Sequence, residues 1–153
     1  MSASNRRDWN PSMAVLPEAV TSGDQVKIYN VRNCDYTSTE EYEVKHYTRT
    51  YDLDKIQSID FVVVPFAEMP SLAHTFLSFG FEGDKYVAIS VEVRREKGEE
   101  YSALKGLMNQ YELMYVIGDE RDLIGLRSNH RLDDVYIYRT TATKEQSRAV
   151  FWT

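Results

Sequence analysis

The residues of this 153-residue chain that could do acid–base chemistry stand in two alternating stretches, AHTFLSFGF and SVEVR. The first stretch contains His74, whose imidazole can accept a proton near neutral pH. The second contains Glu92, whose carboxylate can hold an imidazole in one tautomer and stabilise its cation. The two residues therefore predict a general base and its orienting group, provided that both side chains lie on the same face of the protein.

Residues 74–81 and 86–94 alternate in polarity around a Gly-Asp turn, which is typical of a β-hairpin. Side chains alternate between the two faces of a strand, so we align the apolar faces of both strands against one core. The expected cross-strand pairs are Phe81 with Val87, Phe79 with Ile89 and Leu77 with Val91, which leaves the loop Gly83–Lys85. The opposite face then carries His74, Phe76, Ser78, Ser90, Glu92 and Arg94.

On that second face, His74 is expected to lie across from Arg94 and diagonally from Glu92. Ser78, Ser90 and Arg94 are therefore candidate substrate-binding residues beside a catalytic His74–Glu92 pair. A bulge at either glycine of the hairpin would shift the register by one residue and remove this arrangement. In the alternative interpretation, His74 is a structural histidine near a sheet end, and Glu92 and Arg94 form an ion pair that contributes about 0.2–1 kcal/mol.

Several further elements must position these residues. Strands are expected at residues 26–31, 59–66, 112–117, 122–127 and 134–139. One helix is expected to begin at Ser102 and another at Thr143, where Gln146 completes a capping box. Residues 1–24 are expected to form an extended arm, 33–50 a polar connection and 118–122 a charged hairpin loop. The prediction is a single α+β domain over residues 25–153, mostly antiparallel sheet with one internal helix and a short C-terminal helix.

Composition and charge argue against several classes of function. The net charge of −6 disfavours a nucleic-acid partner. There is no apolar run of about 18 residues that could span a membrane, and the N-terminus lacks the apolar stretch of a secretory signal. The three histidines share no metal-ligand spacing, and neither a glycine-rich phosphate loop nor a G-x-S-x-G phrase occurs. We therefore expect neither a metal nor another cofactor.

Several phrases, taken in order along the chain, are together more specific than any one of them alone. They are NVRNCDY, TRTYDLDKIQSIDF, AHTFLSFGF, SVEVRREKGEEYSALKGL, QYELMYVIGDERDLIGLR and DDVYIYR. From about residue 8 onward the chain resembles the Lnb N-terminal periplasmic domain family, long described as a domain of unknown function. The resemblance implies a permuted papain-like fold, in which the histidine strand precedes the cysteine helix, within bacterial periplasmic or membrane-associated proteins.

The resemblance also implies an activity. Members of the namesake branch transfer an acyl chain from phospholipid to lipoprotein N-termini, so phospholipid and lipoprotein or peptide are the implied substrates. By position, His74 matches the catalytic histidine and Glu92 is the best match for the orienting group. The nucleophilic cysteine of the family is expected in an Asn-Cys-Thr-Thr phrase after the helix that begins near Thr143, and these 153 residues do not include that phrase.

The only cysteine, Cys34, is a second candidate nucleophile. Thiol catalysis requires a thiolate, which a nearby imidazolium or a helix N-terminus favours. The order of cysteine before histidine is that of unpermuted papain-like enzymes. The residues that follow Cys34 are poor helix formers, however, and this favours the alternative of a small, buried side chain.

Two functions remain open at this point. In the first, the chain is a thiol acyltransferase or hydrolase domain without its expected cysteine, and it is inactive in isolation. In the second, it is a non-catalytic, truncated papain-like binding module. Its open cysteine-helix position would then expose apolar sheet surface of the kind that usually marks an interface.

Overall fold

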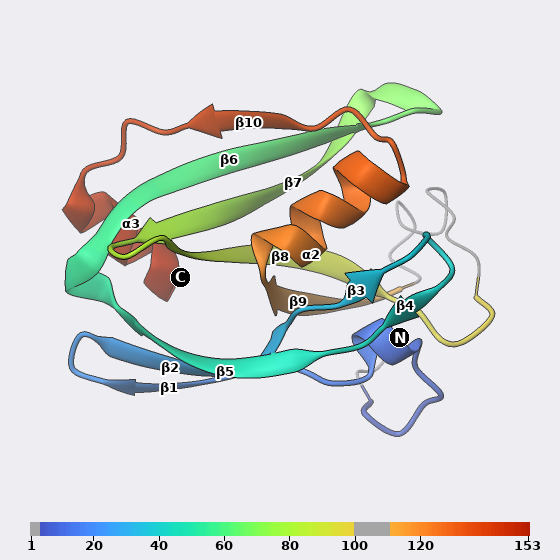
Figure 1. Cartoon of the computed structure of the whole chain (residues 1–153), viewed down its shortest axis with the longest axis horizontal. Coiled ribbons are helices and arrows are strands. Elements are labelled where there is room, and N and C mark those ends of the chain that lie inside the picture. Colours follow the sequence, from blue (N-terminus) through green and yellow to red (C-terminus); the bar gives the residue numbers. More distant parts are fainter. Residues whose placement is uncertain (1–3, 100–110) are drawn as a thin grey trace.

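A large, almost entirely antiparallel sheet dominates the computed structural model, which describes residues 4–99 and 111–153 (Figure 1). Its strands, in spatial order, are β1 (Glu18–Ser22), β2 (Gln25–Arg32), β9 (Glu112–Gly118), β8 (Lys85–Arg94), β7 (Met69–Phe81), β6 (Ile56–Phe66) and β10 (Tyr136–Arg139). The strand β5 (His46–Asp52) pairs with β2, and a separate hairpin consists of β3 (Asp35–Tyr36) and β4 (Tyr42–Glu43). The only parallel pairing between described strands is that of β2 with β9.

The helical elements are short; the one that follows β9 lies across a face of the sheet, and the C-terminal one lies at an end of it (Figure 1). They are η1 (Pro11–Met13), η2 (Leu53–Lys55), α2 (Glu120–Gly125), the π-helical turn η3 (Leu126–His130) and α3 (Lys144–Trp152). The Thr143–Gln146 capping box predicted for the last helix is present. None of the described helices has the length and apolar character that crossing a membrane would need. Together these elements confirm the α+β class.

Two apolar clusters bury the two faces of the central strands. The first draws on β2, β5 and β6–β8, and Phe151 of α3 packs edge-on against Phe79 and Phe81 there. The second includes Phe76 from β7 and Leu123 from α2. Since side chains alternate along a strand, Phe76 and Phe79 point to opposite faces. His74 shares a face with Phe76 and therefore lies on the side that α2 covers.

The β7–β8 hairpin has the predicted faces but not the predicted register. The observed pairs are Leu77 with Ile89, Phe79 with Val87 and Phe81 with Lys85, a shift of two residues. The loop is Glu82–Asp84, because Gly83 (φ +79°) and Asp84 (φ +53°) adopt the left-handed conformations of the turn and Lys85 joins the ladder. An even shift keeps every side chain on its expected face. The ladder ends at Leu77 and Ile89, and beyond it His74 contacts Glu92 and not Arg94.

Several other expectations are corrected by the structure. The expected hairpin loop 118–122 contains the last residue of β9, the cap residue and the start of α2, and the expected strand 122–127 runs from α2 into η3. The expected N-terminal arm contains η1 and β1, which pairs with β2, and the expected polar connection contains β3, β4 and most of β5. The strands predicted at 26–31, 59–66, 112–117 and 134–139 are confirmed within a few residues. The helix predicted from Ser102 lies outside the described residues.

The start of α2 follows from local chemistry. Asp119 caps the helix by accepting a hydrogen bond from the backbone N–H of Arg121, and acidic residues in the first turn suit the helix dipole. Leu123 then packs very close to Gly118 at the end of β9. A Cβ on that glycine would lie 2.1 Å from Leu123 Cδ1. The absence of a side chain at Gly118 therefore lets α2 lie directly against the sheet.

Candidate functional site

His74, Ser90 and Glu92 meet on the α2 side of the sheet. His74 Nε2 lies 3.2 Å from Glu92 Oε1 and 2.9 Å from Ser90 Oγ. Ser90 Oγ in turn donates a 2.7 Å hydrogen bond to the same Glu92 oxygen. The side chains of His74 and Glu92 are 20% and 18% exposed, so both are accessible at the edge of the interior.

This geometry assigns the tautomer of His74. The hydroxyl of Ser90 donates its proton to Glu92, so towards His74 the hydroxyl oxygen can only accept a hydrogen bond. The ionised carboxylate of Glu92 can likewise only accept. Both partners of His74 Nε2 are therefore acceptors, which places the ring proton on Nε2. The lone pair then lies on Nδ1, to which no residue in the described part of the chain is hydrogen-bonded.

Arg127 completes the network from η3. Its Nη2 donates a 2.7 Å hydrogen bond to Glu92 Oε1, its Nη1 donates another of 2.7 Å to the Leu123 carbonyl, and its guanidinium lies 5.1 Å from the centre of the Phe76 ring. Burial alone would raise the pKa of Glu92, but the hydrogen bond from His74 and the positive charge of Arg127 bring that pKa well below its usual range. Glu92 is therefore ionised at neutral pH and can stabilise an imidazolium at His74.

The sequence patterns missed Arg127 because its segment was assigned to a strand. A usable signal was present: Asp119, followed by Glu120 and Asp122, is typical of a helix start. That signal would have placed Arg127 just beyond a helix. It would not have linked Arg127 to Glu92, which is 35 residues away along the chain.

A second buried network holds α2 in place. Asp122 is 0% exposed and accepts hydrogen bonds from Nε and Nη2 of Arg32, from the backbone N–H of Cys34 and from the Tyr36 hydroxyl. The two bonds from one guanidinium make this a bidentate ion pair, the geometrically most specific kind. Asp122 thereby ties α2 to β2 and to the segment after it, which fixes the position from which Arg127 reaches Glu92.

The environment of Cys34 disfavours a nucleophile. Its side chain is 2% exposed, and it lines neither of the cavities described below. Burial, together with the negative charge of Asp122, raises the pKa of the Cys34 thiol to about 11. The thiol is therefore protonated near neutral pH, and the geometry favours the predicted alternative of a small buried side chain.

The three candidate substrate-binding residues have partners within the protein. Ser78 is 1% exposed and donates to Glu120 of α2, and Ser90 bridges His74 and Glu92. Arg94 is 2% exposed and holds the N-terminal segment, through bonds to the carbonyls of Met13 and Ala14, a pair with Glu112 and stacking on Trp9. The geometry therefore favours structural roles for Ser78 and Arg94 and a positioning role for Ser90.

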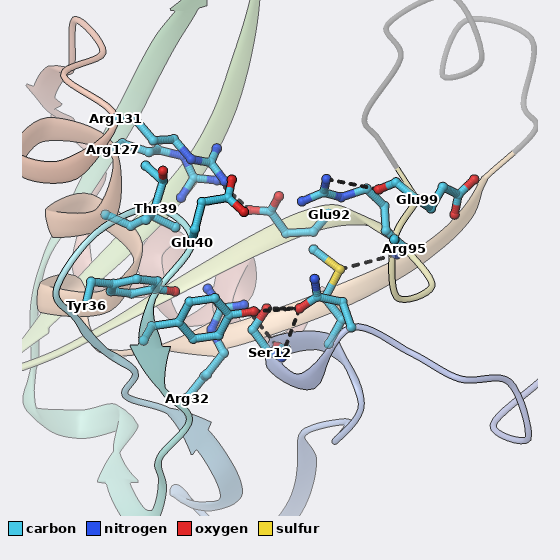
Figure 2. Close-up of a pocket in the computed structure, with 15 residues that line it drawn as sticks. Ser12, Arg32, Tyr36, Thr39, Glu40, Glu92, Arg95, Glu99, Arg127 and Arg131 are labelled. Carbon is cyan, nitrogen blue, oxygen red and sulfur yellow. Dashed lines mark hydrogen bonds and ion pairs between the residues drawn. The ribbon is translucent and has the colours of Figure 1, made fainter.

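A cavity of about 460 Å³ lies against His74 and Glu92. The β7–β8 ladder ends at the Leu77–Ile89 pair, so the strands are no longer paired beside His74. One part of the wall is apolar and includes Val64, Phe66, Val91 and Leu113, and the other is charged and includes Arg95, Arg127 and Arg131. A neighbouring cavity of about 440 Å³ shares Glu92 and these three arginines (Figure 2).

Metal chemistry has no support from the described residues. Within residues 4–99 and 111–153, no group of three or more His, Cys, Asp and Glu side chains is placed to hold a metal ion.

Comparison with known proteins identifies the family of the chain. No curated protein sequence and no solved structure matches the chain. The model of the Lnb N-terminal periplasmic domain family matches residues 43–152. This range covers most of the chain and contains His74, Ser90, Glu92 and Arg127. The chain therefore belongs to the Lnb N-terminal periplasmic domain family, whose name describes a periplasmic domain.

Proposed function

We propose that this domain supplies the general base of a thiol-dependent acyltransferase or hydrolase with a permuted papain-like fold. The observation that carries the proposal is the His74–Ser90–Glu92–Arg127 network. The acceptors in this network keep the ring proton of His74 on Nε2, so that Nδ1 is the basic nitrogen. Both His74 and Glu92 line the wall of a cavity. A base held in one tautomer by a buried, ionised carboxylate is what nucleophilic catalysis requires.

In the proposed reaction, His74 Nδ1 accepts the proton of a thiol, and the thiolate attacks the carbonyl carbon of an ester or amide. The tetrahedral intermediate collapses to a thioester, and the imidazolium returns the proton to the leaving alcohol or amine. Water or an amine then attacks the thioester with His74 again as base, the bond between the acyl carbon and sulfur breaks, and the leaving thiolate takes the proton back from the imidazolium. Glu92 stabilises the imidazolium in both halves. Cys34 is buried and protonated, so we propose that the thiol is supplied by a cysteine other than Cys34.

The shape and polarity of the cavity support an acyl substrate. Its apolar wall suits an acyl chain, while His74 and Glu92 stand next to the charged wall. We therefore propose phospholipid and a lipoprotein or peptide amine as donor and acceptor, and a location at a membrane surface. The family name supports a periplasmic domain; the substrates and the membrane association are inferences from the cavity and from the resemblance.

The test compares the product of the complete reading frame with the isolated 153-residue chain. Acyl-enzyme formation and turnover are measured with an activated thiol-reactive ester and with a short-chain phospholipid. We expect turnover only from the longer product, a loss of at least about 100-fold for His74→Gln, and little change for the matched variant His46→Gln, which lies on β5 away from the cavity. Turnover by the isolated chain that depends on Cys34, or equal activity of both histidine variants, would contradict the proposal.

A second function, a non-catalytic binding module, is favoured by one specific observation. On β8 and β9, the exposed side chains of Val91 (46% exposed), Leu113 (65%) and Tyr115 (60%) form an apolar strip, because Val91 pairs with Tyr115 and Val93 with Leu113. Val91 and Leu113 also line the cavity beside His74, so the strip adjoins it. Such patches often mark interfaces. If the complete protein binds acyl donors without turning them over, and its His74→Gln variant binds them equally well, the binding module is the better description.

A further inference from the structure

Three arginines from two distant parts of the chain converge on the cavity that His74 lines. Arg95 follows β8, Arg127 lies in η3 and Arg131 comes directly after it. Figure 2 shows Arg127 and Arg131 together on one side of the shared space and Arg95 on the other side. The carboxylates of Glu40, Glu92 and Asp133 line the same cavity.

The three guanidinium groups are used to different extents. Arg127 donates one hydrogen bond to Glu92 and one to the Leu123 carbonyl. Arg95 makes one long contact of 3.5 Å, from Nη1 to the carbonyl of Glu99. Within residues 4–99 and 111–153, the guanidinium of Arg131 forms no hydrogen bond or ion pair, although it faces the cavity. Two of the three arginines therefore keep most of their donors available.

The charges around Arg131 bear on which ligand its guanidinium could bind. Partial burial and the adjacent positive charge of Arg127 and Arg95 lower the pKa of Arg131, while the carboxylates of Glu92 and Asp133 act in the opposite direction. Glu40 also lines the cavity. The net effect is unfavourable to the cation, and an additional negative charge between Arg131 and Arg95 would relieve it. Guanidinium groups bind phosphate and carboxylate through paired, charge-assisted hydrogen bonds.

We propose that Arg131 and Arg95 form an anion-binding subsite, which holds a phosphate or carboxylate group of a ligand beside His74. This inference adds a specificity-determining site to the cavity of the proposed function. Binding at the subsite needs no thiol and no turnover, so it can be tested even if the proposed enzymatic activity fails.

The experiment titrates the 153-residue chain with inorganic phosphate at constant ionic strength and pH 7.5, and follows backbone and arginine side-chain NMR signals. Arg131→Gln and Arg95→Gln should each weaken binding by about tenfold or more, the usual effect of losing a charge-assisted hydrogen bond. The matched control Arg121→Gln removes the same charge from an exposed position that does not line the cavity. It should change binding less than about twofold.

A second arm identifies the source of the anion. A soluble monoacyl glycerophosphate, the matching neutral monoacylglycerol and inorganic phosphate are compared below the concentration at which micelles form. Tighter binding of the phosphorylated amphiphile than of the other two supports a lipid-type ligand, and equal binding of both phosphates supports a free anion. Binding of the neutral amphiphile as tight as that of its phosphate, no binding of any phosphate, or equal weakening by Arg131→Gln and Arg121→Gln would overturn the subsite.

Discussion

Replacement of Arg127 by methionine is the sharpest test of the network around His74. Methionine keeps part of the apolar volume against Phe76 but removes the partner of Glu92 and the donor to the Leu123 carbonyl. Arg127 and Glu92 are 6% and 18% exposed, so the variant leaves a largely desolvated carboxylate without its strongest counter-charge.

The expected cost follows from this burial. Removing one partner of a buried ion pair typically destabilises a protein by about 3–5 kcal/mol. Glu92 keeps its bonds to Ser90 and His74, so we place the cost near the lower end, at about 3 kcal/mol. Arg121→Met on α2 is the matched control. Its guanidinium is 65% exposed, and its loss should cost less than about 1 kcal/mol.

The pH dependence gives an independent check. The folded-state pKa of Glu92 is lowered, so its ionisation stabilises the protein above the pKa of the unfolded chain, about 4.3, and this stabilisation is lost as the pH falls further. Arg127→Met should raise the folded pKa towards its ordinary value. The difference in unfolding free energy between wild type and variant should therefore shrink as the pH decreases from 7 to 3.

Urea unfolding at several pH values measures both quantities, and a cycle with Glu92→Gln isolates the pair. We expect the double variant to recover at least about 1 kcal/mol relative to the sum of the single variants. Equal costs for Arg127→Met and Arg121→Met, or a cost that does not change with pH, would show that Arg127 does not hold Glu92 in the ionised form, and the site as described would have to be abandoned.

Three further outcomes are expected. Cys34 of the native protein should react with iodoacetamide far more slowly than Cys34 of the urea-unfolded chain. A pKa near 11 leaves about 300-fold less thiolate than the pKa of about 8.5 of an ordinary thiol. Equal reaction rates, measured by mass spectrometry, would contradict the burial of Cys34. Gly118→Ala should destabilise the protein by about 1–3 kcal/mol, because the new Cβ would overlap Leu123. In the control variant Gly125→Ala, the nearest atom to the new Cβ is 3.9 Å away, so this change should be neutral or stabilise by about 0.5–1 kcal/mol. If thermal unfolding showed the reverse order of stability, the close packing of α2 would be refuted. Asp122→Asn should cost about 3–5 kcal/mol because a buried arginine loses its counter-charge, and a loss below about 1 kcal/mol in the same assay would show that this network does not anchor α2.

The sequence identified the faces of the β7–β8 hairpin but not its register. Alternation has a period of two, so an even shift moves partners without moving faces, and His74, Ser90 and Glu92 remain together. The neighbour of His74 changed from Arg94 to Glu92 because the positive φ angles of the turn determine where the ladder starts. Those angles are only weakly encoded in a Glu-Gly-Asp-Lys stretch.

The helical part of the site could be predicted only in part. The stretch 122–127 has apolar residues at both strand and helix spacing, and packing of Leu123 against Gly118 decides for the helix. The capping residue Asp119 is a local signal and could be recognised from sequence. The meeting of Arg127 with Glu92 is a tertiary contact between separate elements, and no local pattern determines it.

Residues from two separate elements form the site, and this has a consequence for how the site assembles during folding. His74, Ser90 and Glu92 belong to one hairpin and can come together early in folding, but Arg127 arrives only when the helix docks. Until then Glu92 is solvated, competes with water for the imidazole and orients it weakly. In a nascent or partly unfolded chain, the imidazole of His74 is therefore not held in one orientation. Docking of the helix that follows β9 is therefore the step that completes the contacts around His74.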